Sequence, residues 1–459
     1  MADQRWYSGI TRYQWLILVV ASLGWVFDVF EGQVFVASMN EAMPELLPPE
    51  VRDLPSAERQ GALAFYNNVT FAAFLVGGAI GGVLFGMLAD RIGRIRTLVY
   101  TIAMYSVFTL LSAFSEQWWH MALFRFLVAL GVGGEWAVAS ALVAEVFPTR
   151  ARAWSLSIFH ASSVFGTFLA VLAGTFIVAE REIAESIPFL AGMGISSWRI
   201  GFVLGAIPAA LIIMIRLSLR EDSDTWARAR SKPDASPGRF SELFSPQFRT
   251  RTAVGVCLAA VGLATFWGAH IYGKDTLRQT VEAQYLAASP EAPREAILEE
   301  NFRPIKRWDM LGMLLVTTGG GLGLLAFGPL SERLGRRGAF LAFHIGGLVS
   351  ALVLFQGITA QTPLMVFLPI FGFLTLGMHA GYAVYFPELF PTRMRSTGAG
   401  FCFNVGRILA APILFTAGWM QRDLGLPLRD SASLLSLLFV LGIALYWVSP
   451  ETRGQELPE

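Results

Sequence analysis

Apolar stretches of about 20 residues recur along almost all of this 459-residue sequence, and they limit the folds that it can adopt. A helix of that length crosses a hydrocarbon core about 30 Å thick. The chain is 54% hydrophobic and only 15% charged, whereas soluble domains have about 25% charged residues. Because lipid cannot satisfy the open edges of strands, each span must be a helix. The sequence therefore predicts an all-α membrane protein that crosses the bilayer many times.

We place twelve transmembrane helices at residues 14–37, 67–88, 97–115, 119–144, 153–179, 198–219, 252–273, 309–330, 338–357, 363–386, 396–418 and 431–449. Lysine and arginine in the connecting segments indicate the orientation, because cytoplasmic loops carry an excess of them. With the N-terminus inside, the inner segments hold 20 of these residues and the outer segments hold 12. Both termini are therefore predicted to be cytoplasmic, in a cell (inner or plasma) membrane.

Two short motifs each occur twice, about half the chain apart. The loop Gly86–Arg94 returns as Gly328–Arg336, at an offset of 242 residues. The segment Glu145-Val-Phe-Pro-Thr-Arg150 returns as Glu388-Leu-Phe-Pro-Thr-Arg393, at an offset of 243 residues. Two independent motifs with nearly one offset indicate a duplicated architecture, in which two pseudo-symmetric bundles contain six helices each.

The duplication divides the chain into three parts. Residues 1–219 form the predicted N-terminal six-helix bundle, and residues 252–459 form the C-terminal one. The polar segment 220–251 is predicted to be a cytoplasmic linker with a short surface helix near 241–244. Residues 274–308, with charges of both signs, are predicted to form a long outer loop, and the sequence does not indicate its role.

These repeated motifs resemble those of the major facilitator superfamily of transporters. Gly86–Arg94 resembles the superfamily signature between helices 2 and 3, and Gly328–Arg336 its weaker copy between helices 8 and 9. Two segments of the fourth span resemble motifs of the proton symporters for sialate, aromatic acids and other organic metabolites: Arg125-Phe-Leu and Gly131-Val-Gly-Gly-Glu-Trp136. The C-terminal segment Pro450-Glu-Thr-Arg-Gly454 resembles instead the ending of sugar porters. The resemblance implies two six-helix bundles around one central cavity, which work by alternating access.

The repeated loops also bring charged residues to the inner membrane surface, where the resemblance implies a gate. Gly86 permits close backbone approach, and the Asp90 carboxylate can cap a helix N-terminus or pair with an arginine. By resemblance, Asp90 latches the gate with Arg150 or the start of the eleventh span. The predicted gating residues are Gly86, Asp90, Arg91, Gly93, Arg94, Glu145, Arg150, Glu332, Arg333, Glu388 and Arg393. The alternative is that these charges only determine topology.

Ionisable residues inside the spans are the candidates for proton coupling, because each costs roughly 2.5–3.5 kcal/mol to insert. Asp28 and Glu31 lie on one face of the first span, and two close carboxylates cannot both ionise easily. Arg125 on the fourth span lies at a similar depth by helical rise. We predict that these three residues form a coupling cluster; the alternative is that the two acids are hydrated at the outer mouth. Glu135, deeper on the fourth span, is a second coupling candidate or a structural partner.

Four further residues are predicted to bind substrate. Arg407 lies mid-way along the eleventh span with Asn404 on the same face, and a cation there would bind an anion. The alternative role for Arg407 is a salt bridge between helices, without a part in substrate binding. His160 and His379 lie within the fifth and tenth spans, where the alternative is hydrogen-bonded packing.

The sequence therefore predicts a proton-coupled symporter of a small organic solute, most simply a carboxylate or sugar acid. Its partners would be substrate, protons and the lipid bilayer, with the proton gradient as energy source, no cofactor or metal, no nucleic acid, and a monomeric state. No P-loop, zinc-binding His motif or nucleophile elbow occurs, so an enzyme is not expected. The alternatives are a symporter or uniporter of sugars or neutral metabolites, a proton-coupled exporter, and a sensor that does not transport.

Overall fold

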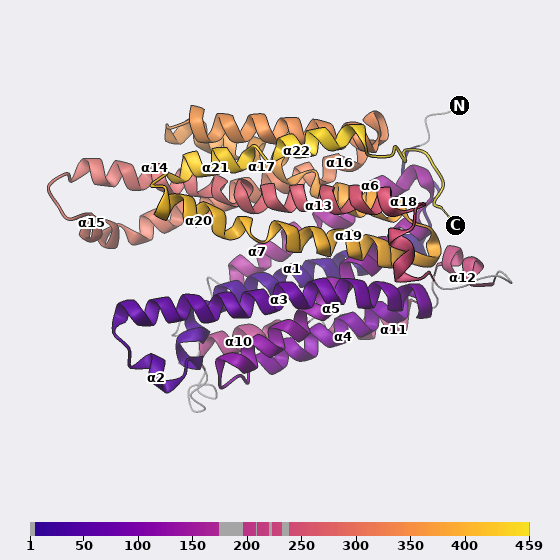
Figure 1. The fold of residues 1–459 in the computed structure, drawn as a ribbon, viewed down its shortest axis with the longest axis horizontal. Coiled ribbons are helices and arrows are strands. Elements are labelled where there is room, and N and C mark those ends of the chain that lie inside the picture. Colours follow the sequence, from indigo (N-terminus) through magenta and orange to yellow (C-terminus); the bar gives the residue numbers. More distant parts are fainter. Residues whose placement is uncertain (1–4, 174–195, 208, 220–222, 232–237, 459) are drawn as a thin grey trace.

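The computed structural model describes residues 5–173, 196–207, 209–219, 223–231 and 238–458, and within these ranges all regular structure is helical. Figure 1 shows two bundles of long helices with roughly parallel axes, one above the other. Eleven stretches of the described residues are long and apolar enough to cross a membrane. The first half of the chain forms most of the lower bundle, and the second half forms the upper one.

The helices of the first half are α1 (Arg12–Leu46), α2 (Pro49–Arg52), α3 (Ser56–Ile92), α4 (Arg94–Ser112), α5 (Trp118–Val146), α6 (Thr149–Ala161), α7 (Ser163–Ala173), α10 (Ser197–Leu204) and α11 (Ala209–Ser218). Those of the second half are α13 (Arg249–Gly268), α14 (Gly273–Ala288), α15 (Arg294–Glu300), α16 (Phe302–Leu352), α17 (Gln361–Leu376), α18 (His379–Leu389), α19 (Arg395–Ala410), α20 (Ile413–Asp423), α21 (Leu428–Ser436) and α22 (Phe439–Ala444). The halves meet along two pairs of helices, α3 with α19 and α6 with α16.

The helix α16 contains two membrane crossings. The rings of Phe327 and Phe343 stack with centroids 5.8 Å apart, although 16 residues of straight helix would separate them by about 24 Å. The chain therefore reverses between them, at Gly335, whose φ of 80° is non-helical. Gly93, the equivalent residue of the first copy, has φ 108° and separates α3 from α4. Both reversals use a conformation that favours glycine, and the predicted twelve-helix fold is confirmed.

Two connections differ from the sequence prediction. The segment 274–308 is largely helical rather than a loop, because α14 continues the seventh span and α15 and the start of α16 follow. Along α14, Arg278 pairs with Asp275 at 3.5 Å and with Glu282 at 2.8 Å, which supports a solvated helix. In the linker, the short helix η2 (Phe240–Phe244) confirms the predicted surface helix, and α12 (Asp224–Ser231) adds a second one. Residues 174–179 of the fifth span and part of the linker lie outside the described residues.

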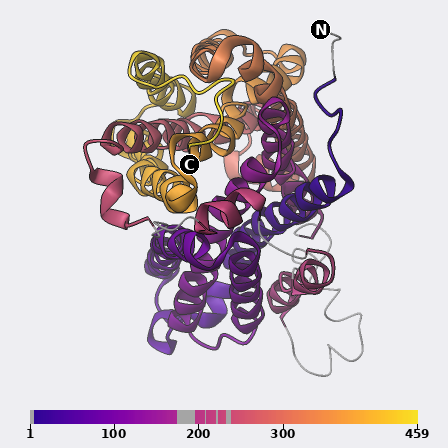
Figure 2. The ribbon, with the colours of Figure 1, turned by 90° about the vertical axis from the view of Figure 1, so that its right-hand side faces the viewer.

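Both ends of the chain lie at the same end of the bundles, which we call the terminal face (Figure 1). The Gln14 side chain at the start of α1 donates to the Val146 carbonyl at the end of α5, at 2.7 Å. The Tyr385 hydroxyl near the end of α18 donates to the Pro450 carbonyl at 2.6 Å. Figure 2 looks onto this face and shows the C-terminal end between the two bundles. That the terminal face is cytoplasmic stays a prediction.

Candidate functional site

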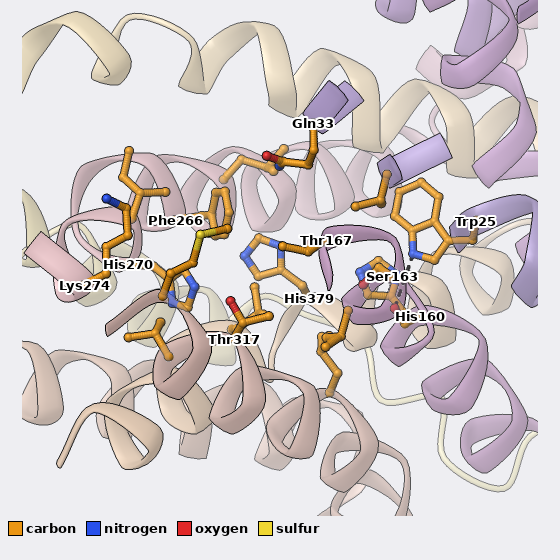
Figure 3. A pocket seen from close by; sticks show the side chains of 18 of the residues that line it. Trp25, Gln33, His160, Ser163, Thr167, Phe266, His270, Lys274, Thr317 and His379 are labelled. Carbon is orange, nitrogen blue, oxygen red and sulfur yellow. Dashed lines mark hydrogen bonds between the residues drawn. The ribbon is translucent and has the colours of Figure 1, made fainter. Parts of the chain in front are cut away.

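A cavity of about 420 Å³ lies between the two halves (Figure 3). It is lined from the first half by Trp25, Val29, Gln33, His160, Ser163, Val164 and Thr167, and from the second by Leu263, Phe266, His270, Ile271, Lys274, Met313, Val316, Thr317, Leu324, Leu376, His379 and Phe403. Rings and aliphatic side chains form most of the wall, and a few polar groups interrupt it. This is the usual composition of a small-molecule site.

The two histidines predicted to bind substrate both line this cavity. The Trp136 indole nitrogen lies 3.3 Å from Nδ1 of His160. An indole N–H can only donate, so Nδ1 accepts and the His160 ring is neutral with its proton on Nε2. His379 is buried, and its Nε2 has no hydrogen-bond partner among the described residues.

A third histidine of the cavity, His270, was not predicted. It lies in the short turn η3 (His270–Tyr272) after α13, close to the predicted end of the seventh span. Its partner is the Thr375 hydroxyl, 2.7 Å from Nδ1 and 105 residues away in the chain. The only signal in the sequence was a histidine near a span end, and nothing in the sequence linked it to Thr375.

Glu31 and Arg125, predicted to meet because of their depth, form an ion pair. The Arg125 guanidinium is fully buried and also donates to the Ser112 hydroxyl at 2.8 Å. The Thr109 hydroxyl donates to Glu31 at 3.0 Å. The aromatic ring of Phe35 covers the guanidinium at 5.1 Å, so this charge is well compensated at its depth.

Asp28 has its main contact with Glu135, the second coupling candidate, rather than with Arg125. Its carboxyl lies beside that of Glu135, with Arg407 and Glu31 as its other charged neighbours. Both Asp28 oxygens and Oε2 of Glu135 are buried without a hydrogen-bond partner among the described residues. Gly24, one turn before Asp28, makes room for Glu135, because a Cβ there would overlap the Glu135 carboxylate. The four residues therefore make two contacts, the Glu31–Arg125 ion pair and the adjacent carboxyls of Asp28 and Glu135. Oε2 of Glu31 and Nε of Arg125 also lack a partner among the described residues.

Arg407 and Asn404 lie between the halves, outside the lining of the central cavity. The Arg407 guanidinium lies over the Phe403 ring at 5.0 Å and reaches Gly78 of α3. The Asn404 amide donates to the Gly400 carbonyl at 2.9 Å and to the Gly133 carbonyl at 3.4 Å. In this conformation Arg407 therefore bridges α19 and α3, with Asp28 as a charged neighbour.

Asp90 fastens the two halves together at the terminal face. Its carboxylate accepts the backbone N–H groups of Ser396 at 3.2 Å and Thr397 at 2.9 Å, and also the Thr397 hydroxyl at 2.6 Å. These donors belong to the first turn of α19, so Asp90 caps a helix of the opposite half. Of its two predicted partners, the start of the eleventh span is the one in contact. Arg150 donates to the Ser8 carbonyl.

Glu145 forms the centre of the same gate. Its Oε1 accepts Arg94 of its own half at 2.8 Å and Arg395 of the other half at 2.7 Å. The Ser223 hydroxyl donates to its second oxygen at 2.6 Å. All three charged side chains are completely buried. A single carboxylate thus joins two arginines across the interface between the halves.

The second copy of the motifs repeats this arrangement within the C-terminal half. Arg336 pairs with Glu388 at 3.0 Å and with Glu332 at 2.9 Å. The Thr452 hydroxyl of the C-terminal tail donates to Glu388 at 2.6 Å. Arg152 of the first half approaches Glu388 only to 3.8 Å. This copy therefore connects the C-terminal half mainly to itself.

The remaining gating residues lie at the edge of the same face. Arg393 pairs with Glu242 at 2.6 Å, and the Arg333 carbonyl accepts from Arg453 at 3.0 Å. Burial alone would raise the pKa of the Glu242 carboxyl, but the hydrogen bond and charge of Arg393 outweigh it and hold that pKa below its ordinary value. Arg91 is exposed to solvent.

These contacts close the terminal face, and a second cavity lies next to the central one. Lys274 lines the central cavity and also a second cavity of about 430 Å³ among the charged residues of α14 and the start of α16. The Arg395 guanidinium donates to the Pro458 carbonyl at 2.8 Å, so the C-terminal tail also covers the gate. The two halves and the C-terminal tail therefore close the structure at the terminal face.

Gly86→Ala is expected to lower the stability of this closed state by about 1–3 kcal/mol, the usual cost of overpacking. A Cβ at Gly86 would lie 2.8 Å from the Ser396 carbonyl oxygen and 2.9 Å from the Thr397 Cα, so backbone must move. The check is the thermal unfolding midpoint of the purified protein. Gly61→Ala on the same helix meets open space and serves as the control, with an expected stabilisation of up to about 1 kcal/mol. Equal midpoints for the two variants would contradict the close approach.

Residues 14–266 and 310–459 match the family described as "Sugar (and other) transporter". The chain belongs to this family. It is therefore a multi-pass membrane transporter of the major facilitator superfamily, and not an enzyme.

Relatives of this transporter cover almost all of its length. It is 29% identical to a probable 4-methylmuconolactone transporter of Cupriavidus pinatubonensis, over 98% of this chain and 93% of the relative. It is 26% identical to the sialic acid transporter NanX of Escherichia coli, over 95% of both chains. The structure of the proton:xylose symporter XylE has a TM-score of 0.70 at 16% identity, over 97% of this chain and 98% of that one. These likenesses support a transporter of metabolites and organic acids with the major facilitator fold.

Proposed function

We propose that this transporter is a proton-coupled symporter of a small organic anion, a carboxylate or sugar acid, which works by alternating access with the terminal face in the cytoplasm. The observation that carries the proposal is the pair of buried, adjacent carboxyls of Asp28 and Glu135, in which both Asp28 oxygens and Oε2 of Glu135 have no hydrogen-bond partner among the described residues. Two adjacent carboxyls in a setting that excludes water cannot both hold a charge at low cost. One of them is therefore suited to carry a proton through the transport cycle.

The position of Arg407 supports coupling between this proton and an anion. Arg407 belongs to the C-terminal half, and its charged neighbour Asp28 belongs to the other. When Asp28 holds a proton, none of the described residues supplies an anionic neighbour to balance the charge of Arg407. An anionic substrate can then supply the missing charge, so proton and substrate are favoured together. The names of relatives, which include transporters of sialic acid and cis,cis-muconate, support an organic anion as substrate.

The test is uptake into proteoliposomes that contain the purified transporter. With an alkaline interior, a radiolabelled organic acid that the protein binds is expected to accumulate above its external concentration. A protonophore that dissipates the gradient should reduce accumulation to equilibration. Equal uptake with and without the gradient would indicate a uniporter, and accumulation only of neutral sugars would refute the choice of anions.

Arg407→Gln is expected to weaken the binding of anionic substrates by roughly 10- to 100-fold, the loss of one charge-assisted hydrogen bond of about 1.5–3 kcal/mol. The measurement is KM for proton-driven uptake. Arg422→Gln provides the control, because Arg422 is 79% exposed near the end of α20 and pairs only with Asp423 among the described residues. An unchanged KM in Arg407→Gln would assign Arg407 a structural role at the interface.

A further inference from the structure

The hydrogen-bond partners of His270 fix which of its ring nitrogens carries the proton. The Thr375 hydroxyl donates its single proton to the Phe371 carbonyl at 2.7 Å. Thr375 must therefore accept in its second contact, 2.7 Å from Nδ1 of His270. It follows that Nδ1 of His270 donates, and that Nε2 of the neutral ring presents a lone pair. Both residues are buried, so this orientation is well protected from water.

His379 has the same orientation by a separate contact. Its ring hydrogen-bonds the Gly262 carbonyl, which can only accept. The nitrogen without a partner is Nε2, so Nδ1 is the donor and Nε2 again presents a lone pair. His379 is 94% buried, and a buried acceptor without a partner is costly.

The cavity therefore has two chemically different ends. Figure 3 shows His270 on the side of the cavity near Lys274 and His379 in the middle, between His270 and His160, with the Phe266 ring beside His270 and His379. Phe266 stacks on His270 at 5.0 Å and tilts toward His379 at 5.5 Å. His160, with its proton on Nε2, lies at the other end beside Trp25. The His270 end offers an acceptor next to the flat Phe266 ring, His379 offers a second acceptor in the middle, and the His160 end offers a donor.

We propose that His270 and His379 form an acceptor site that selects substrates carrying an O–H or N–H donor on a planar ring. Thr375 acts as a positioning residue, because it holds the His270 proton on Nδ1. The inference rests on the proposed function and narrows it, from organic anions in general to planar anions with a donor group. An analogue without the donor leaves a buried lone pair unmatched, and sites of this kind reject such analogues strongly.

The test uses matched pairs of acids with the full-length transporter. Each pair is a ring acid with a donor and its methylated form, such as 4-hydroxybenzoate with 4-methoxybenzoate and indole-5-carboxylate with its N-methyl derivative. Affinity is measured as the concentration that gives half-maximal thermal stabilisation, a readout that does not require transport. We expect the donor-bearing member to bind at least tenfold more tightly.

Two variants of Thr375 separate positioning from packing. Thr375→Val keeps the shape but removes the acceptor for His270, and it should reduce the preference to less than threefold. Thr375→Ser keeps the hydroxyl and should retain the tenfold preference. Equal binding within each pair, an unaltered preference in Thr375→Val, or failure of every ring acid to bind would overturn the inference. If the inference is overturned but another organic anion shows proton-driven uptake, the proposed function still holds. If the donor preference in binding is found but no uptake is driven by protons, only the proton coupling is rejected.

Discussion

Asp28→Asn is expected to abolish accumulation driven by a proton gradient and to leave exchange of substrate across the membrane intact. A single proton moving down a gradient of one pH unit supplies about 1.4 kcal/mol, which supports roughly tenfold accumulation of the co-transported solute. Asparagine has nearly the size of aspartic acid but cannot release a proton. The accumulation ratio should therefore fall from about ten to about one. The measurement is the steady-state ratio of internal to external substrate in proteoliposomes.

Two further variants test whether the loss of accumulation is specific to the buried carboxyl pair. Glu135→Gln removes the neighbouring carboxyl and should have the same effect, because Asp28 then lacks the second acid that makes its ionisation costly. Asp423→Asn provides the control, since Asp423 is exposed and pairs with Arg422 at the end of α20. If both Asp28→Asn and Glu135→Gln still accumulate substrate, coupling must lie with other residues, and Glu31 with Arg125 are the next candidates.

The sequence predicted the fold and the register of the gate, because both depend on local patterns. Apolar length and loop charge locate the spans, and glycine at Gly93 and Gly335 marks reversals that few other residues permit. Helical rise also gives depth, which is why Glu31 and Arg125 were correctly expected to meet. Depth, however, does not say which neighbouring helix a side chain faces.

The rotation of each helix about its own axis, which the sequence does not specify, explains the differences at the candidate site. Asp28 and Glu31 are three residues apart on one helix, yet one faces Glu135 and the other faces Arg125. Arg407 lies at the expected place along its helix but points toward α3 rather than into the cavity. The His270–Thr375 pair joins segments 105 residues apart, and no spacing rule connects them. Such contacts depend on how the helices pack, which a single sequence does not state.

Glu145→Gln is expected to destabilise the closed terminal face by about 3–5 kcal/mol, the usual cost of removing one partner from a buried ion pair. Arg94 and Arg395 both lie within 2.8 Å of the same Glu145 oxygen. A glutamine side chain supplies no negative charge, so two buried guanidinium groups from opposite halves would then repel each other. The thermal unfolding midpoint of the purified protein should fall by several degrees, and substrate uptake should slow because the closed state is less populated.

Two other carboxylates at the same face show how much of this loss is due to burial and position. Glu242→Gln breaks the ion pair with Arg393. The Glu242 side chain is 26% exposed and the Arg393 side chain 37%, so the loss should be at most about 1 kcal/mol. Glu388→Gln should cost less than Glu145→Gln, because Arg336 keeps Glu332 as a partner at 2.9 Å. After Glu145→Gln, Arg94 keeps Asp90 at 3.0 Å, but Arg395 keeps no ion pair among the described residues. The order Glu145, Glu388, Glu242 follows from whether each carboxylate joins the two halves and whether every arginine that it pairs with keeps another anion. Equal losses for Glu145→Gln and Glu388→Gln would instead indicate that the two copies of the motif share the gate, and that the N-terminal copy has no special part in closing it.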